Sequence, residues 1–417
     1  MRDTDLYQQL LGLSSPWTVS RVELDAKKRR VDVWAEHSDK AKWECPECDK
    51  RCGLHDHDEE RSWRHLDSCQ FETYLHARVP RVRCDDHGIK QVRVPWAEPR
   101  SRFTAMFERF AIDVLLEADV LGAARILNIT WDEAHGIMAR AVARGLARRK
   151  HTIPERMGID EKSLAKGYRF ATIVNDLGGP KHDPYVVELA EGRGKEALVK
   201  CWGKFSLDDL EKVEAVAMDM WQPYIEMVKA LVGPEKIVFD RFHIMMHMND
   251  AVDLVRRREN RMLREEGDDR LVGSKHMWLY AEENLPERYA DSFDVLRHTD
   301  LKTARAWAIK EMLRKLWERP SMEAGKRWHR RWHSWATRCR LKPVREVAAM
   351  IQRRLPNVLS YFTHRITNAA SEAINSTIQM IKKRAFGFRS FVNFRVAVLF
   401  RCGALDLYPR LEGHPNA

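Results

Sequence analysis

The sequence predicts a multidomain α+β protein, and three observations support this fold class. At 417 residues the chain is longer than one ordinary domain, so we expect two to four domains. The hydrophobic pattern changes along the chain, from strand-like alternation, through mixed strands and helices, to a purely helical stretch. Apolar residues make up 44% of the chain, which is enough to build several cores.

The charge balance favours an acidic partner. The net charge is +11 and the isoelectric point is near 9.2, which suits a nucleic acid, with a membrane surface as the competing interpretation. No window approaches the run of about 18 apolar residues that a spanning helix needs. The N-terminus carries acidic residues and lacks a signal-peptide pattern. We therefore expect a soluble intracellular protein.

Residues 1–95 are predicted to form a β-rich zinc-binding module. Residues 17–37 have the pattern of a β-hairpin around a polar turn. Two pairs of thiol or imidazole ligands follow, each with two residues between its members, as in a four-coordinate structural zinc site. The predicted ligands are Cys45, Cys48, Cys84 and His87. Substitute ligands could be Cys52, His55, His57 and Cys69, and buried cysteines without metal are the alternative.

Residues 100–150 are predicted to form a helix-turn-helix domain after a linker marked by Pro95 and Pro99. Two helical patterns precede Thr130, where a capping box with Glu133 predicts the start of a third helix. In this outline the last helix enters the DNA groove. Its predicted DNA-binding residues are Arg140, Arg144, Arg148, Arg149 and Lys150. The alternative is an ordinary three-helix bundle with a solvated basic face.

From residue 151 the pattern becomes α/β. Three strands in succession are followed by a helix, a strand, a helix and a strand: 156–164, 168–177, 184–190, 194–205, 213–220, 222–233 and 236–240. This order is typical of a ribonuclease-H-like sheet. We expect the core to occupy 151–250 and 356–417, interrupted by an all-helical insertion over 251–355. The insertion is rich in tryptophan, which we expect to pack between helices.

Three carboxylates fall where a phosphoryl-transfer site would need them. Asp160 lies in the first predicted strand of the core and Asp219 ends the fourth. Glu372 is the only acid between Glu346 and Asp406, a segment that contains nine Lys or Arg. A helical projection places Glu372 opposite the apolar positions of its helix: Ala370, Ile374, Ile378 and Ile381. Such a segment suits a polyanion, and a metal ion would offset the one acid.

Three such acids could hold two Mg²⁺ ions, with Mn²⁺ as a substitute. Hard oxygen ligands suit Mg²⁺, and paired ions stabilise both oxygens of an in-line displacement. Each acid could instead serve a turn, a helix cap or the surface. Asp240 could replace Asp219. His243 and His247, four residues apart, could assist a metal, but we expect them to be packing or surface residues.

Four segments of the chain resemble the ISL-three family of bacterial insertion-sequence transposases. Residues 367–395 resemble its C-terminal catalytic segment, and 158–176 and 216–244 resemble its first two catalytic blocks. The CPEC and CDDH elements within 45–87 resemble its N-terminal zinc domain. The resemblance implies that Asp160, Asp219 and Glu372 are the catalytic, Mg²⁺-binding DDE acids, and that 251–355 is an insertion domain.

One position departs from the pattern of DDE enzymes. Seven residues after the glutamate, where such enzymes often carry Lys or Arg, this chain has Gln379. The C-terminal residues expected to contact DNA instead are Lys382, Lys383, Arg384 and Arg389.

The resemblance implies a transposase that binds double-stranded DNA at terminal inverted repeats and at a target. The expected reactions are metal-dependent end cleavage and strand transfer, by a homodimer on DNA in the bacterial cytoplasm, associated with the nucleoid and not with a membrane. One alternative is a non-catalytic zinc and helix-turn-helix DNA-binding regulator derived from a transposase. A second is a metal-dependent nuclease without strand transfer.

Overall fold

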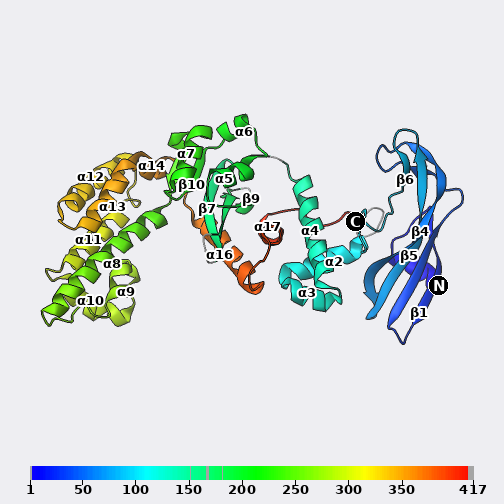
Figure 1. Cartoon of the computed structure of the whole chain (residues 1–417), viewed down its shortest axis with the longest axis horizontal. Helices are drawn as coiled ribbons and strands as arrows, with labels where there is room; N and C mark the ends of the chain where they lie inside the picture. The colour runs from blue at the N-terminus through cyan, green and yellow to red at the C-terminus, as the bar shows by residue number, and fades with distance from the viewer. Residues whose placement is uncertain (1, 151, 166–168, 181, 412–417) are drawn as a thin grey trace. The chain divides into compact units, whose positions relative to one another are not determined.

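The computed structural model describes residues 2–150, 152–165, 169–180 and 182–411 (Figure 1). Two compact units make up this part of the chain. Unit 1 contains residues 2–149, 384–386 and 399–411, and unit 2 contains residues 150–383 and 387–398. None of the described helices combines the length and the apolar character needed to cross a membrane.

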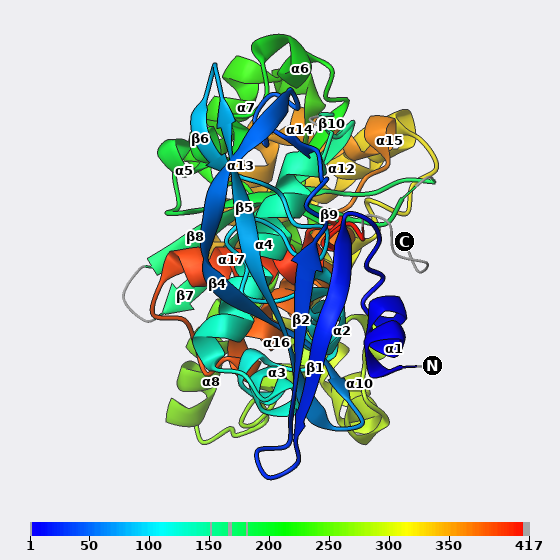
Figure 2. The ribbon, with the colours of Figure 1, turned by 90° about the vertical axis from the view of Figure 1, so that its right-hand side faces the viewer.

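Unit 1 begins with helix α1 (Asp3–Leu10) and a six-stranded sheet of order β1-β2-β5-β4-β3, with β6 added to β5. The predicted hairpin is present as antiparallel β1 and β2, which lie side by side in Figure 2. Asp25 closes its turn by accepting bonds from the backbone N–H of Lys27 and Lys28. The strands are β1 (Trp17–Asp25), β2 (Arg30–His37), β3 (Trp43–Glu44), β4 (Arg51–Ser68), β5 (Phe71–Cys84) and β6 (Gly88–Gln91).

The three helices predicted after the linker are also present: α2 (Ala105–Glu117), α3 (Val120–Leu127) and α4 (Trp131–Arg148). The predicted capping box is formed, because Thr130 accepts from the Glu133 N–H and Glu133 accepts from the Thr130 N–H. Asn128 ends α3 in the left-handed conformation, which sets the sharp turn into α4.

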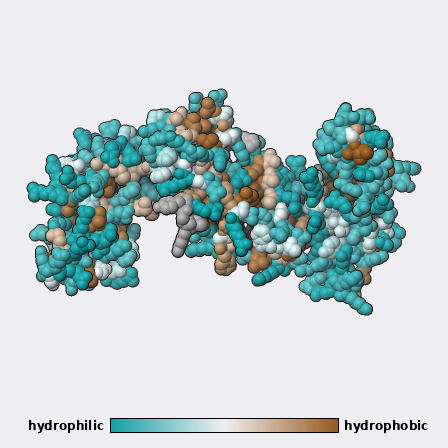
Figure 3. Space-filling view, viewed as in Figure 1, coloured by the Kyte–Doolittle hydropathy of each residue, from teal (hydrophilic) through white to brown (hydrophobic). Residues whose placement is uncertain are grey.

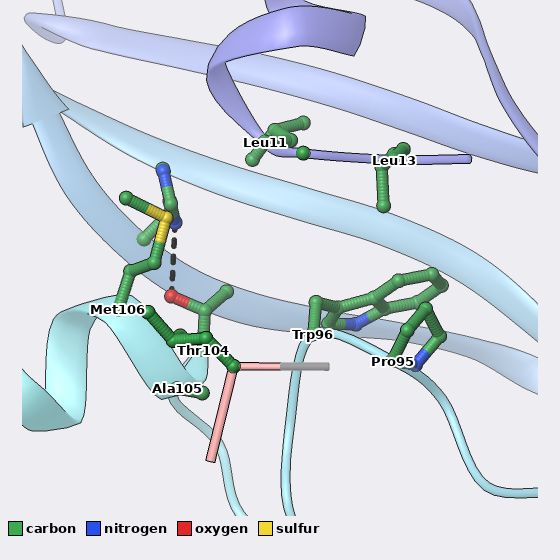
Figure 4. Close-up of a pocket in the computed structure, with 10 residues that line it drawn as sticks. Leu11, Leu13, Pro95, Trp96, Thr104, Ala105 and Met106 are labelled. Atoms are coloured by element: carbon green, nitrogen blue, oxygen red, sulfur yellow. Dashed lines mark hydrogen bonds between the residues drawn. The ribbon is translucent and has the colours of Figure 1, made fainter. Parts of the chain in front are cut away.

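The β-rich module and the helices of unit 1 are hydrogen-bonded to each other. The Arg64 N–H on β4 donates to the Arg102 carbonyl, and the Thr104 N–H donates back to the Arg64 carbonyl. His65 and the Thr104 hydroxyl form a further bond of 2.9 Å, drawn as the dashed line in Figure 4. A small pocket at this joint is lined by Leu11, Leu13, Trp96 and Met106, among others (Figure 4).

The end of the chain also belongs to unit 1. Arg401, on α17 (Phe391–Cys402), donates to the carbonyls of Leu115, Leu116 and Ala118, which are left open at the end of α2. Tyr408 donates to Asp113 at 2.6 Å. The predicted domain 356–417 is therefore divided between the two units.

Unit 2 contains a five-stranded sheet of order β11-β10-β7-β8-β9, in which β7, β10 and β11 are parallel and β8 and β9 antiparallel. The predicted strands and the two predicted helices between them are present. The elements are β7 (Arg156–Ala165), β8 (Arg169–Asp176), β9 (Tyr185–Glu191), α5 (Lys195–Trp202), α6 (Leu207–Glu211), β10 (Ala215–Met218), α7 (Gln222–Leu231), η1 (Pro234–Lys236) and β11 (Ile237–Phe239).

A long helical segment follows β11 and packs on itself. It comprises α8 (Arg241–Glu265), α9 (Lys275–Leu279), η2 (Glu282–Asn284), η3 (Glu287–Tyr289), α10 (Ala290–Arg297), α11 (Lys302–Arg314), α12 (Met322–Arg338), α13 (Lys342–Arg353), α14 (Leu355–Leu359) and α15 (Tyr361–His364). Trp278 and Trp332 are fully buried, as expected for core tryptophans, whereas Trp335 is 38% exposed. Figure 3 shows a mostly hydrophilic surface over this segment, at the left of the view.

The glutamate helix α16 (Ala369–Arg384) then returns to the sheet of unit 2. Ile374, Ile378 and Ile381 are buried and Glu372 is exposed, as the helical projection predicted. Asn368, which lies on the same side as Glu372 when the helical angle is extended to it, is instead 1% exposed. It precedes the first helical residue, so the helical angle does not describe its direction.

A buried ion pair joins α17 to the sheet of unit 2, and its removal should lower the stability of the protein. Arg395 donates two bonds of 2.7 and 2.6 Å to Glu188 on β9. Burial alone would raise the pKa of Glu188, but the bonds and charge of Arg395 hold it below its ordinary value. We expect Glu188→Gln to cost about 2 kcal/mol, because Arg395 keeps its charge without a counter-ion.

Thermal unfolding measures this cost, and Glu191→Gln on the same strand is the matched control. Glu191 pairs with Arg169 at the surface, so its loss should cost less than about 1 kcal/mol. Because the pKa of Glu188 is depressed, its contribution is present at neutral pH and is lost as the pH falls through that pKa. Equal melting shifts for the two variants would contradict the assignment.

Candidate active site and metal centre

The predicted zinc ligands meet in unit 1. Cys45 and Cys48 lie in the turn between β3 and β4, while Cys84 ends β5 and His87 lies in the turn to β6. Sγ of Cys84 lies 3.6 Å from Nδ1 of His87 and 3.8 Å from Sγ of Cys48, and Sγ of Cys45 lies 3.7 Å from the same Nδ1. Ligands of a tetrahedral zinc about 2.3 Å away lie about 3.7 Å apart, so the set fits zinc.

The substitute ligands lie outside this group. Among the described residues, the four predicted ligands are the only cluster of potential metal-binding atoms that all lie within 4.8 Å of one another. Cys52 points its thiol to the Lys50 carbonyl, and Nε2 of His57 lies 2.7 Å from Nε2 of His37. Cys69 is exposed.

The parallel strands of unit 2 bring three aspartates to one edge of the sheet. Met218 pairs with Ile159 and with Phe239, so Asp160, Asp219 and Asp240 follow at equivalent positions. The Asp240 N–H donates to the Met218 carbonyl at 2.9 Å and continues this pairing. Asp219 also accepts a bond from the Trp221 N–H, but it is not the cap of α7, because Trp221 itself holds the N-cap position.

Asp160 is held from two sides. Its carboxylate accepts a 2.7 Å bond from the Glu161 N–H and a 2.5 Å bond from the side-chain amide of Asn375. Burial raises the pKa of Asp160, and the charges of Asp219 and Asp240 add to this rise. A divalent cation would relieve such crowding of negative charge. The sequence did not reveal the role of Asn375, because the contact joins residues far apart in the chain.

The charges of Asp240 and of the residues that follow it act on Glu372. Partial burial and the charge of Asp240 raise the pKa of Glu372, and His243 and Arg241 act in the opposite direction. Within the described residues, Asp160, Asp219 and Glu372 do not form a group whose ligand atoms all lie within 4.8 Å. Asp160 thus lies within β7, Asp219 directly follows β10, and the charge of Asp240, which directly follows β11, acts on Glu372.

Asp240 and His243 form a buried pair next to these acids. Asp240 is 4% exposed and caps α8 by accepting a bond from the Phe242 N–H, while Nδ1 of His243 lies 2.9 Å from its other oxygen. This hydrogen bond raises the pKa of His243, and the charges of Asp219 and Asp160 contribute. His243 is therefore hydrogen-bonded to an acid of the site and is not only a packing residue, whereas His247 is exposed.

A fifth carboxylate, Glu161, has its own partner. Arg193 forms an ion pair with Glu161 and stacks 3.9 Å above the ring of Trp221, two residues after Asp219. Burial raises the pKa of Glu161 to about 7, although the charge of Arg193 opposes the rise. Arg193 therefore connects Glu161 on β7 to Trp221, which follows β10.

Helix α16 approaches β7 at a glycine. A Cβ atom on Gly158 would lie 2.3 Å from Oγ of Ser371, so no other residue fits without a shift. Asn175 lies opposite Gly158 on β8, and the side-chain amides of Asn175 and Asn368 are buried without a hydrogen-bond partner. The contact between the start of α16 and strands β7 and β8 is therefore polar and closely packed.

Most of the predicted DNA-binding residues of α4 have partners inside unit 1. Arg140 and Arg144 pair with the buried Glu108, and Arg144 also pairs with Glu98. Arg148 pairs with Asp406, Arg149 donates to the Gly403 carbonyl, and Lys150 is exposed. Contact of these residues with DNA remains a prediction, and for Arg144 it would require buried ion pairs to open.

Most of the predicted DNA-binding residues near α16 have exposed side chains. Lys382 donates to the Ser163 carbonyl at 2.9 Å. The side chains of Lys383, Arg384 and Arg389 are exposed.

Comparisons with known proteins agree on one family. A model for the transposase of the ISL3 family matches residues 157–398, more than half of the chain. A model for the zinc finger of the IS204/IS1001/IS1096/IS1165 transposases matches residues 41–87, and one for the helix-turn-helix domain of ISL3 transposases matches 92–142.

Individual relatives are similar over almost their whole length. The transposase for insertion sequence element IS1557 of Mycobacterium tuberculosis is 26% identical over 447 positions, covering 100% of this chain and 99% of the relative. The transposase for IS1001 of Bordetella parapertussis is 24% identical over 408 positions, covering 95% and 98%.

The zinc assignment predicts one zinc ion per chain, measurable by atomic absorption. Cys84→Ser should release the metal and unfold the sheet of unit 1, because the ligands join two separate turns. Cys69→Ser and Cys52→Ser are matched controls that should retain it. Retention of zinc by Cys84→Ser would remove this thiol from the ligand set.

The close approach at Gly158 predicts an overpacking cost. Gly158→Ala should lower stability by about 1–3 kcal/mol, because the new methyl group displaces the start of α16. Adding Ser371→Ala removes the oxygen that it meets and should recover part of the loss in thermal unfolding. If the double variant were no more stable than Gly158→Ala, another contact would cause the strain.

Proposed function

This chain belongs to the ISL3 family of transposases, and on that premise we propose that it is an active DDE transposase. It would bind the terminal inverted repeats of an insertion sequence, cut the DNA at its ends and join them to a target. The observation that carries this proposal is the meeting of Asp160, Asp219 and the Glu372 helix at one edge of the unit 2 sheet.

The architecture supports the same conclusion. The strand order β11-β10-β7-β8-β9, with three parallel strands, is the order expected for the proposed ribonuclease-H-like core. Asp160 lies on its central strand, Asp219 follows the adjacent parallel strand, and Glu372 lies on a helix bound to β7 through Asn375. The helical segment between β11 and α16 would be the insertion domain of this core.

The donor set suits Mg²⁺, because carboxylate oxygens are its preferred protein ligands and the pKa of both Asp160 and Glu372 is raised. Asp160, Asp219 and Glu372 would hold the ions, which when bound supply an activated water and stabilise charge at phosphorus. Asn375 orients Asp160, and His243 is hydrogen-bonded to Asp240. Direct displacement at phosphorus requires no covalent protein–DNA intermediate.

The N-terminal modules would select the DNA. The zinc module and the helix-turn-helix of unit 1 would bind the terminal repeats, and the exposed Lys383, Arg384 and Arg389 would contact the backbone. Two element ends must be joined in one event, so a homodimer on DNA is the expected assembly.

One observation favours a second candidate, a non-catalytic DNA-binding regulator. The three acids do not gather within the reach of a single ion in the described part of the chain. In the proposed enzyme, DNA and metal would draw Glu372 toward the aspartates. In a regulator, Glu372 and the two aspartates would remain apart.

A substitution at Glu372 separates these two candidates. Glu372→Gln should leave binding of an end fragment nearly intact and lower its Mg²⁺-dependent cleavage by at least about a hundredfold, because one ligand loses its charge. Glu346→Gln, at an exposed acid on α13, is the matched control and should behave as wild type. Cleavage by Glu372→Gln at the wild-type rate would refute the DDE assignment.

The products of the same reaction separate a transposase from a nuclease. Incubating the labelled end fragment with a plasmid should yield joined molecules with the wild-type protein. Cut fragments without joined molecules would indicate a nuclease.

A further inference from the structure

Helix α12 carries a stripe of arginines that has no role in the proposed function. Between Ala324 and Arg345 the chain has no acidic residue and eight Lys or Arg. The buried residues of α12 are Gly325, His329, Trp332 and Ala336. At about 100° per residue, Arg327, Arg331 and Arg338 lie within about 40° of one another and about 150° from the centre of that buried face. We call these three residues the arginine stripe.

Packing fixes the direction in which the arginine stripe points. The ring of Trp332 is buried and donates to the Ile309 carbonyl on α11 at 3.0 Å, and Trp328 donates to the Met312 carbonyl at 2.7 Å. Gly325 seats the ring of Phe362, where a Cβ atom would lie 2.6 Å from a ring carbon. Helix α12 therefore cannot turn about its axis, and the stripe faces solvent.

Among the described residues the arginine stripe forms no ion pairs, unlike other arginines of the helical segment. Arg257, Arg264 and Arg270 each form an ion pair with a nearby aspartate. Within the described residues, Arg327 and Arg331 have no carboxylate within 4.0 Å, and Arg338 bonds only to the Ser334 hydroxyl. Glu323, four residues before Arg327, is paired with Lys326 at 2.8 Å, although its charge also interacts with that of Arg327.

The positive charges of the arginine stripe repel one another, and a bound polyanion would offset this repulsion. Like charges four residues apart on one helix face destabilise the helix, here by the pair Arg327 and Arg331. Arg327 and Arg338 are eleven positions apart in sequence, or about 16 Å at about 1.5 Å per residue. Phosphates repeat every 3.4 Å or so along each DNA strand, so this length matches roughly five base pairs.

We propose that the arginine stripe of α12 is a second DNA-binding surface, which holds the phosphate backbone of duplex DNA without reading its sequence. Arginine forms bidentate bonds with phosphate, and three such contacts fix a duplex along the helix. The inference rests on the proposed function, because that function supplies the DNA. It adds a contact outside the zinc module, the helix-turn-helix and the acids.

The salt dependence of DNA binding tests the proposal. The full chain is titrated with a random-sequence duplex at several salt concentrations. Arg327→Gln/Arg331→Gln/Arg338→Gln should reduce the slope of log K against log salt by about two to three, since each lost phosphate contact removes about 0.9. The fall in affinity should be the same for duplexes of different sequence.

Two control variants make the result specific. Arg257→Gln/Arg264→Gln/Arg270→Gln removes the same charge from the same segment and should keep the wild-type slope, because these arginines are already paired. The triple lysine variant at 327, 331 and 338 keeps the charge and should retain most of the slope. Together they separate a local contact from a general charge effect or a folding defect.

The possible failures are distinguishable. A wild-type slope in the stripe variant, or an equal loss in the paired-arginine control, would overturn the arginine stripe alone and leave the Glu372 result standing. Failure of the lysine variant to bind would mean that the stripe acts through structure rather than charge, and would also overturn it. If the wild-type chain binds no duplex DNA, both this inference and the proposed function fall.

Discussion

The site of unit 2 depends on the parallel pairing of β10 between β7 and β11. This pairing aligns Met218 with Ile159 and Phe239, and so delivers an aspartate from each strand to the same edge of the sheet. The hydrogen bonds and ion pairs around the acids offset that concentration of negative charge. Asn375 and the Glu161 N–H donate to Asp160, His243 pairs with Asp240, and Arg193 pairs with Glu161.

Arginine serves two different purposes in this chain, and its partners distinguish them. Arg144, Arg395 and Arg401 lie against buried carboxylates or open helix carbonyls, where they join segments distant in sequence. Removing such a residue leaves buried polar groups without partners. The arginine stripe of α12 has no such internal task, so its charge remains available for a ligand. The net charge of +11 alone could not separate these two populations.

Local patterns in the sequence predicted much of the structure, and long-range contacts account for what they missed. The capping box at Thr130, the strands around Asp160 and Asp219, and the zinc ligands with their two-residue spacings depend on neighbouring residues. The burial of Arg144, the return of Tyr408 to α2 and the bond from Asn375 to Asp160 join residues far apart in the chain. Their directions are set by packing that periodicity does not encode.

The late position of α16 and of the C-terminal segment in the chain has a consequence for synthesis. A ribosome that has just made β11 has produced Asp160, Asp219 and Asp240, but not Glu372. Unit 1 is likewise incomplete until Arg401 and Tyr408 have been added to α2. A nascent or prematurely terminated chain therefore lacks both the last acid and a finished N-terminal unit. On the proposed function, an unfinished chain lacks an acid that DNA cleavage requires.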